Sequence, residues 1–259
     1  MIYDCFMFLN EFDLLKLRLK ELNPYVDKFV ICESTLTHQG QPKECFLEQR
    51  LSEFSEYSDK IIYHKVSKGT DPSQRISIIE ALQHCAEDDI ILLSDLDEIP
   101  NLEKFDFQKY LDEQKDEILG FHGPLYYYYL NVEYPGEAYG TTITTYKTAK
   151  LMGLEALRHA RTKNKIPNAS WHFSYLGGVD QIVYKLESFF HREFNTPSFK
   201  DKNRLAICLQ NNLDPFNRGD QLKLVKIDDS FPKTIVNNIE EYKHLIKEEF
   251  GFNSWGNNA

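Results

Sequence analysis

Four large apolar residues, Ile90 to Leu93, run directly into the acidic sequence Ser94-Asp95-Leu96-Asp97-Glu98. A short, continuous apolar run between acidic residues is typical of a strand buried on both faces, as in a parallel sheet. Ligands of open α/β sheets bind beyond the carboxyl ends of the strands. The pattern therefore predicts a central strand that carries Asp95 and Asp97 to a ligand crevice. Pro100 is expected to keep this strand from continuing.

Strand and helix patterns alternate along the first hundred residues. Strands are predicted at 2–9, 26–34, 61–66 and from residue 90, and helices at 11–22 and 72–86. Asp71 is expected to cap the second helix, with Pro72 at its first helical position. This alternation indicates βαβ units with right-handed crossovers. We expect an α/β fold with a mostly parallel central sheet flanked by helices.

The second half of the sequence is less regular. It contains strand candidates at 121–132, 140–147 and 171–175, and a helix candidate at 179–190. A chain of 259 residues can bury one substantial core. We therefore expect a single domain over residues 1–259, made of a first half (about 1–100), a second half (about 101–230) and a peripheral C-terminal segment (231–259).

Composition excludes several classes of protein. No apolar run approaches the ~18 residues that a membrane span requires, so no membrane span is expected. The N-terminal Met1–Phe6 carries an early acid and no basic stretch, which indicates a strand and not a secretory signal, and we expect a cytoplasmic location. The net charge of −10 disfavours nucleic acid as a partner. Five cysteines without a C-x-x-C pair disfavour a disulfide scaffold or a structural zinc site.

Asp95 and Asp97 are the principal metal candidates. In an extended chain their carboxylates lie on one side, ~6–7 Å apart, where a divalent cation relieves their repulsion. The competing interpretation is a solvated, Asp-rich turn.

Polar residues that follow other strands are expected to reach the same crevice. Asn10, Glu33 and Ser94 lie at the carboxyl ends of the first, second and fourth strands, although Asn10 and Glu33 would equally serve to cap or solvate loops. Gln74 and Arg75, near a helix N-terminus, are expected to bind an anionic ligand, or Arg75 pairs with surface acids instead. No G-x-G-x-x-G or Gly-Lys-Ser/Thr loop is present, so a metal would have to hold any phosphates.

The segment Trp171 to Asp180 supplies the remaining candidates. His172 faces away from its aromatic neighbours in an extended strand and is predicted to be a third metal ligand, although a lone His is often structural. Gly177-Gly178 permits close backbone approach to a ligand. Asp180, at a helix start, is the candidate general base, or an ordinary first-turn acid. His191, ~16–18 Å further along that helix, ranks below His172 as a ligand.

Several ordered blocks resemble one known family. They are Tyr3-Asp4-Cys5-Phe6, Phe8-Leu9-Asn10-Glu11-Phe12-Asp13-Leu14-Leu15, Val26 to Ser34, Ser94 to Pro100 and Trp171-His172-Phe173-Ser174 before Gly177-Gly178, continued by Lys185-Leu186-Glu187-Ser188-Phe189 and Glu193-Phe194-Asn195-Thr196-Pro197. Over residues 1 to about 200 the chain resembles glycosyltransferase family seventeen, whose members add the bisecting sugar to N-glycans.

The resemblance implies a GT-A type nucleotide-diphospho-sugar transferase fold and an inverting transfer that depends on Mn²⁺ or Mg²⁺. The implied donor is a UDP-sugar, with UDP-GlcNAc expected, and the implied acceptor is a glycan or glycolipid. Asp95 and Asp97 match the family's metal motif. The first half would then bind the nucleotide and the second half the acceptor. Animal members carry a membrane anchor and stalk without counterpart here, so we expect a bacterial or viral glycan or a lipid-linked sugar as acceptor.

In this mechanism the metal bridges the two phosphates, Arg75 assists, and Asp180 deprotonates the acceptor hydroxyl, with Glu187 as the second choice of base. Two other functions remain open from the residues alone. One is a metal-dependent phosphohydrolase that uses Asp95, with Lys65 or Lys68 as the nearby cation. The other is a non-catalytic carbohydrate-binding protein that uses the tyrosines at 126–129.

Overall fold

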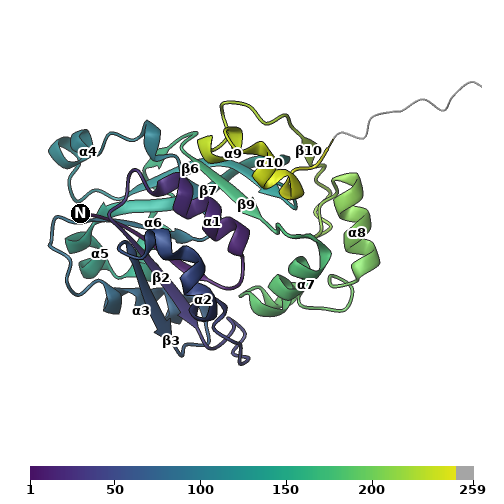
Figure 1. The fold of residues 1–259 in the computed structure, drawn as a ribbon, viewed down its shortest axis with the longest axis horizontal. Coiled ribbons are helices and arrows are strands. Elements are labelled where there is room, and N and C mark those ends of the chain that lie inside the picture. The colour runs from purple at the N-terminus through teal and green to yellow at the C-terminus, as the bar shows by residue number, and fades with distance from the viewer. Residues whose placement is uncertain (249–259) are drawn as a thin grey trace, which may run out of the picture.

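A ten-stranded sheet forms the centre of this computed structural model, which describes residues 1–248 (Figure 1). In spatial order its strands are β3 (Ile61–Val66), β2 (Lys28–Ser34), β1 (Ile2–Phe8), β4 (Ile90–Asp95), β7 (Val132–Thr145), β6 (Leu119–Tyr127), β9 (Ser170–Ser174) and β5 (Glu98–Pro100). Two short strands complete it, β10 (Lys223–Leu224) on β7 and β8 (Lys165–Ile166) on β6.

Most of these strands point the same way. The first four pair in parallel, as do β6 and β9, whereas β7 runs antiparallel to both of its neighbours and β5 runs antiparallel to β9. The predicted α/β class with a mostly parallel sheet flanked by helices is therefore confirmed. The parallel order also brings the carboxyl ends of β1, β2 and β4 to one edge.

Helices cover both faces of the sheet (Figure 1). The α-helices are α1 (Phe12–Leu22), α2 (Phe46–Arg50), α3 (Asp71–Ala81), α4 (Phe107–Glu113), α5 (Tyr146–Met152), α6 (Leu154–Ala160), α7 (Gly178–Ser188), α8 (Lys202–Asn211), α9 (Lys233–Val236) and α10 (Ile239–Tyr242). Short 3₁₀ helices span η1 (Leu51–Tyr57), η2 (Leu102–Lys104), η3 (Arg192–Phe194) and η4 (Lys243–Leu245).

Alternation along β1 shows how the sequence makes two cores. Phe6 and Phe8 point to one face, where the leucines of α1 cover them, while Cys5 and Met7 point to the other face and pack with α3 and α6. Successive side chains of a strand face opposite sides of the sheet, so a strand buried on both faces is apolar at nearly every position. A third cluster joins the end of β6 to α7 and α8.

Three predicted segments have different limits in the structure. The strand expected at 121–132 ends at Tyr127, because Tyr128 adopts a left-handed backbone (φ 69°) and donates its N–H to Ser174 O. The strand expected at 140–147 is longer and starts at Val132, since it forms a bulged hairpin with β6. The helix expected at 72–86 ends at Ala81.

The C-terminal segment packs on the first core as far as the structure describes it. Phe231, Ile235, Tyr242 and Leu245 are buried in the same cluster as α1. Residues 249–259 lie outside the described residues, and the division of one domain into two halves and a peripheral segment stays a prediction. Within residues 1–248, every helix is too short or too polar to cross a membrane.

Candidate active site

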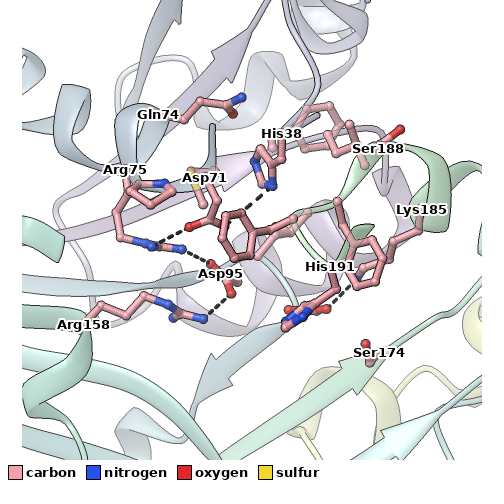
Figure 2. A pocket seen from close by; sticks show the side chains of 18 of the residues that line it. His38, Asp71, Gln74, Arg75, Asp95, Arg158, Ser174, Lys185, Ser188 and His191 are labelled. Atoms are coloured by element: carbon pink, nitrogen blue, oxygen red, sulfur yellow. Dashed lines mark hydrogen bonds and ion pairs between the residues drawn. The ribbon is translucent and has the colours of Figure 1, made fainter. Parts of the chain in front are cut away.

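A cavity of about 700 Å³ opens at the carboxyl ends of β1, β2 and β4. Its floor includes Asp95 and Asp97, and its walls come from the loop after β2, the start of α3, and helices α6 and α7. Figure 2 shows Arg75 and Arg158 reaching Asp95 from one side, with Lys185 and His191 across the cavity. The cavity therefore lies where the apolar strand and its acidic continuation predict a ligand site.

Asp95 is held by two arginines. One carboxylate oxygen lies 3.2 Å from Arg75 Nη2, and the other accepts a hydrogen bond from Arg158 Nη2. Burial alone would raise the pKa of Asp95, but Arg158 and Arg75 outweigh it and hold that pKa below its usual range. Both oxygens of Asp95 are therefore already engaged by protein cations.

Asp97 has a different pair of partners. Lys185 Nζ lies 2.7 Å from Oδ2 of Asp97, and His172 Nε2 lies 3.5 Å from Oδ1. Burial opposes the charged form, yet Lys185 and His172 lower the pKa of Asp97. The short strand β5 explains the approach of His172, because it pairs with β9 in a register that sets Glu98 opposite His172.

Asp97 and His172 fit a divalent cation. A carboxylate oxygen and an imidazole nitrogen 3.5 Å apart can converge on one ion, and both donor types suit Mn²⁺. The other ring nitrogen of His172, Nδ1, is buried without a hydrogen-bond partner in the described residues. No group of three His, Cys, Asp or Glu in residues 1–248 is arranged to hold a metal, so this pair would leave further positions to water or ligand oxygens.

Glu98 anchors two cavity arginines and was not predicted as a site residue. It is 1% exposed, and its carboxylate accepts hydrogen bonds from Arg158 at 2.9 Å and from Arg161 at 2.9 Å. Burial would raise the pKa of Glu98, but these two arginines lower it. The only sequence signal was a third acid directly after the Asp-x-Asp pair.

Arg18 supports the acidic turn from beneath. It is fully buried on α1 and donates to the carbonyl oxygens of Asp95, Leu96 and Glu98 at 2.9–3.1 Å. Its other nitrogens form a two-bond ion pair with Asp4, at 2.6 and 2.8 Å. The sequence did carry a signal, because Arg18 lies four residues from Leu14 and from Leu22 on the apolar face of the helix.

Three residues predicted to contact the ligand have structural partners outside the cavity. Ser94 is 1% exposed and accepts a hydrogen bond from Arg18 at 2.6 Å. Glu33 is fully buried and accepts from Leu47 N at 3.1 Å, Glu48 N at 3.3 Å and Tyr63 Oη at 2.8 Å, so it caps the N-terminus of α2. Asn10 exchanges amide hydrogen bonds with Gln181 of α7.

The two candidate bases also lie outside the cavity. The side chain of Asp180 is 85% exposed and pairs with Lys202, and that of Glu187 is 49% exposed and pairs with Lys200. Their positions on α7 direct both carboxylates away from the cavity residues Lys185 and Ser188 of the same helix. The structure therefore does not bring either acid to Asp97.

Gln74, Arg75, His172 and His191 do line the cavity. The side-chain amide nitrogen of Gln74 donates hydrogen bonds to Leu36 O at 3.1 Å and to Lys68 O at 2.9 Å. Arg75 is 2% exposed and, besides Asp95, contacts Glu155 at 2.7 Å. His191 is exposed and pairs with Glu193 at 2.8 Å.

Of the tyrosines at 126–129, three are buried and Tyr129 is half-buried. Tyr126, Tyr127 and Tyr128 are 4%, 7% and 1% exposed. The rings of Tyr126 and Tyr127 pack against those of Phe173, Phe231, Tyr134 and Tyr175. Neither Lys65 nor Lys68, the two candidate cations of the phosphohydrolase alternative, is among the residues that line the cavity, and Lys65 pairs with Glu48. These placements weaken the specific support for both alternative functions.

Comparison with known proteins identifies the family of this chain. The model of glycosyltransferase family 17 matches residues 1–251, and the chain belongs to this family. The resemblance seen in the ordered sequence blocks is thereby confirmed. The observed parallel sheet with flanking helices agrees with the GT-A type fold that the resemblance implied.

Two mammalian relatives of this chain have the same enzyme name. The β-1,4-mannosyl-glycoprotein 4-β-N-acetylglucosaminyltransferase of Rattus norvegicus is 25% identical over 93% of this chain, and that of Mus musculus is 24% identical over 93%. The chain spans about half the length of these relatives, 53% of each.

Among solved structures, a mannosyltransferase from Pyrobaculum calidifontis in complex with GDP-Man and Mn²⁺ has a TM-score of 0.47 and 11% identity. The match covers 80% of this chain and 69% of the mannosyltransferase. That likeness is too distant to assign a donor or metal here.

Proposed function

We propose that this protein is a metal-dependent inverting glycosyltransferase. It would transfer a sugar, expected to be N-acetylglucosamine, from a UDP-sugar to a hydroxyl of a glycan or glycolipid acceptor. The observation that carries the proposal is the Asp97–His172 pair beside an arginine cluster, on the floor of a cavity at the carboxyl ends of the parallel strands. Membership of glycosyltransferase family 17 supports the reaction class.

The charges on the cavity floor favour entry of a cation together with a diphosphate. Three guanidinium groups, those of Arg75, Arg158 and Arg161, are linked by ion pairs to four carboxylates. This cluster therefore carries one net negative charge, and Asp97, Glu11 and Lys185 beside it add one more when the neighbouring histidines are neutral. A bound divalent cation would offset these two charges and so remove the repulsion of a diphosphate.

Asp97 and His172 would hold the cation. When bound, it supplies a Lewis acid that neutralises charge developing on the departing UDP. Arg158 and Arg75 lie beside Asp95 on the same floor, where guanidinium groups can donate to phosphate oxygens. The protein's own contribution is to keep these guanidinium groups oriented before the UDP-sugar binds, so that little reorganisation is needed during transfer.

Glu11 is the cavity carboxylate best suited to be the general base. Inversion requires a base that removes the acceptor's hydroxyl proton while its oxygen attacks the anomeric carbon and the bond to the diphosphate breaks. In the described residues, the other cavity carboxylates each pair with an arginine or, for Asp97, with Lys185 and His172. Glu11 has a single cationic partner, Lys185 at 3.6 Å, and accepts one further hydrogen bond, from Asn10 N at 3.2 Å. We assign this role to Glu11 in place of Asp180.

Glu11→Gln is expected to lower the turnover number roughly a hundredfold, the lower end of what a general base contributes, because glutamine cannot take a proton. Affinity for UDP in the presence of Mn²⁺ should stay within about twofold, measured by calorimetry. Asp180→Asn is the matched comparison, and it is expected to retain turnover. A Glu11→Gln enzyme with normal turnover and an inactive Asp180→Asn enzyme would return the role to Asp180.

Thermal unfolding with UDP-, GDP- and CMP-sugars, each with and without Mn²⁺, tests the function directly. A ligand at a hundred times its dissociation constant stabilises the folded state by about 2.7 kcal/mol. For a chain of this size, the expected rise in Tm is about 5–10 °C, for the UDP-sugar with Mn²⁺ only. Equal rises in Tm with and without Mn²⁺ would contradict the metal dependence. No rise in Tm with any nucleotide sugar would contradict the transferase function.

A further inference from the structure

An aromatic residue stands exposed at the mouth of the cavity. Phe190, just after α7, is 55% exposed and lines the cavity together with His191. Tyr139, on the β7 side, is the other large aromatic side chain that is both exposed (43%) and part of this lining in residues 1–248. The ring of Tyr139 is already approached by Arg161 and Lys165, whereas the ring of Phe190 contacts His191 edge-on. Phe190 therefore offers apolar surface to a ligand.

The segment that carries Phe190 is held in place by a distant loop. The side-chain amide of Gln39 donates to Leu186 O at 3.2 Å and to Phe189 O at 3.1 Å, and its oxygen accepts from Asn195 at 2.8 Å. The N–H of His38 donates to Ser188 O at 2.9 Å. These bonds satisfy carbonyl groups that the end of α7 leaves free. Phe190 is thus fixed in position without being buried.

We propose that Phe190 is the stacking surface for the acceptor's sugar ring. The C–H face of a pyranose packs on an aromatic ring, and the exposed His191–Glu193 pair beside it can exchange hydrogen bonds with hydroxyl groups. The inference rests on the proposed transferase function. The diphosphate must reach Asp97 and the arginines on the floor, of which Arg75 is buried and Arg158 is 14% exposed, so the mouth is left for the second substrate.

Gln39 acts as a positioning residue in this arrangement. Within residues 1–248 its side chain forms no hydrogen bond with Phe190 or with the cavity floor, but it restrains the carbonyl directly before Phe190. Loss of its side chain would free the segment to move while leaving the ring present. Gln39→Ala is therefore expected to weaken acceptor binding and to leave UDP binding unchanged.

Saturation-transfer NMR with methyl glycosides provides the test. The probes are the methyl glycosides of β-N-acetylglucosamine, α- and β-mannose and β-galactose, each added to protein saturated with UDP and Mn²⁺. At least one is expected to bind, about fivefold more weakly to Phe190→Ala and with retained affinity to Phe190→Trp. Ile207→Ala, a substitution of an equally exposed side chain (54%) outside the cavity, should have no effect.

The outcomes distinguish a failure of the proposed stacking surface from a failure of the proposed transferase function. Unchanged glycoside affinity in Phe190→Ala, or no binding of any probe to the natural protein, overturns the stacking surface. A loss of UDP affinity in Phe190→Ala also overturns it, since the ring would then serve the nucleotide. A third outcome is that no nucleotide sugar raises the Tm of the natural protein, while glycoside binding, measured without UDP, still depends on Phe190. In that case the transferase function is wrong and the sugar-binding surface is retained.

Discussion

Asp97→Asn is expected to reduce transfer from the UDP-sugar roughly a thousandfold, because a metal ligand contributes several kcal/mol of charge stabilisation and each ~1.4 kcal/mol is tenfold in rate. Asparagine keeps the shape of the side chain but removes the negative charge that attracts both the cation and Lys185. Lys185 retains Glu11 as a partner at 3.6 Å, so the folded state should survive. Initial rates and thermal unfolding of the same preparation check both expectations.

Asp88→Asn is the matched control for Asp97→Asn. Asp88 precedes the opposite end of β4, where its side chain is 68% exposed and pairs with Lys115. Exposed ion pairs contribute little to stability, and this one is far along the strand from the cavity, so rate and Tm should stay unchanged. Full activity of Asp97→Asn, or equal losses in the two variants, would remove Asp97 from the metal site.

Arg18→Met is expected to lower the free energy of unfolding by about 3–5 kcal/mol, since it leaves the carboxylate of Asp4 buried without its cation. For a chain of this size, that corresponds to a fall in Tm of roughly 10 °C. The carbonyl oxygens of Asp95, Leu96 and Glu98 also lose their donor. The acidic turn should therefore loosen, and affinity for UDP with Mn²⁺ should fall even at temperatures where the protein stays folded.

Two further variants distinguish the ion pair from simple loss of an arginine. Arg50→Met removes an arginine at the surface that pairs with Glu53 and lies over the Phe12 ring, 3.7 Å from its centroid. We expect a much smaller loss of stability than in Arg18→Met, because exposed ion pairs contribute little. The double variant Asp4→Leu with Arg18→Met removes both buried charges, so it should recover part of the stability while nucleotide affinity stays low. If Arg18→Met were as stable as Arg50→Met, the ion pair would not support the turn.

Local patterns were sufficient for the central strand and its acidic end. The run from Ile90 to Leu93 predicts a strand buried on both faces, and β4 occupies that position between β1 and β7. The prediction succeeded because a parallel strand buries both faces wherever it lies in the sheet, so its pattern depends little on which partners it finds. The placement of Asp95 and Asp97 at the cavity follows from the same geometry.

The partners of single polar residues did not follow from the local pattern. Glu33 and Ser94 both follow the expected rule for strand ends, yet Glu33 caps α2 and Ser94 binds Arg18. A buried polar group takes whichever partner the fold places within hydrogen-bond distance, and that partner is remote in sequence. Asp180 shows the same limit, because its side-chain direction depends on how α7 is rotated against the sheet.

The sequence by itself determined the family, the alternation of strands and helices, and the carboxylates at the end of β4. The tertiary structure alone decided which cations face those carboxylates: Arg75 and Arg158 on Asp95, Lys185 and His172 on Asp97, and Arg18 beneath the turn. The reason is that burial pattern is a property of consecutive residues, whereas an ion pair depends on two side chains that only folding brings within a few ångströms.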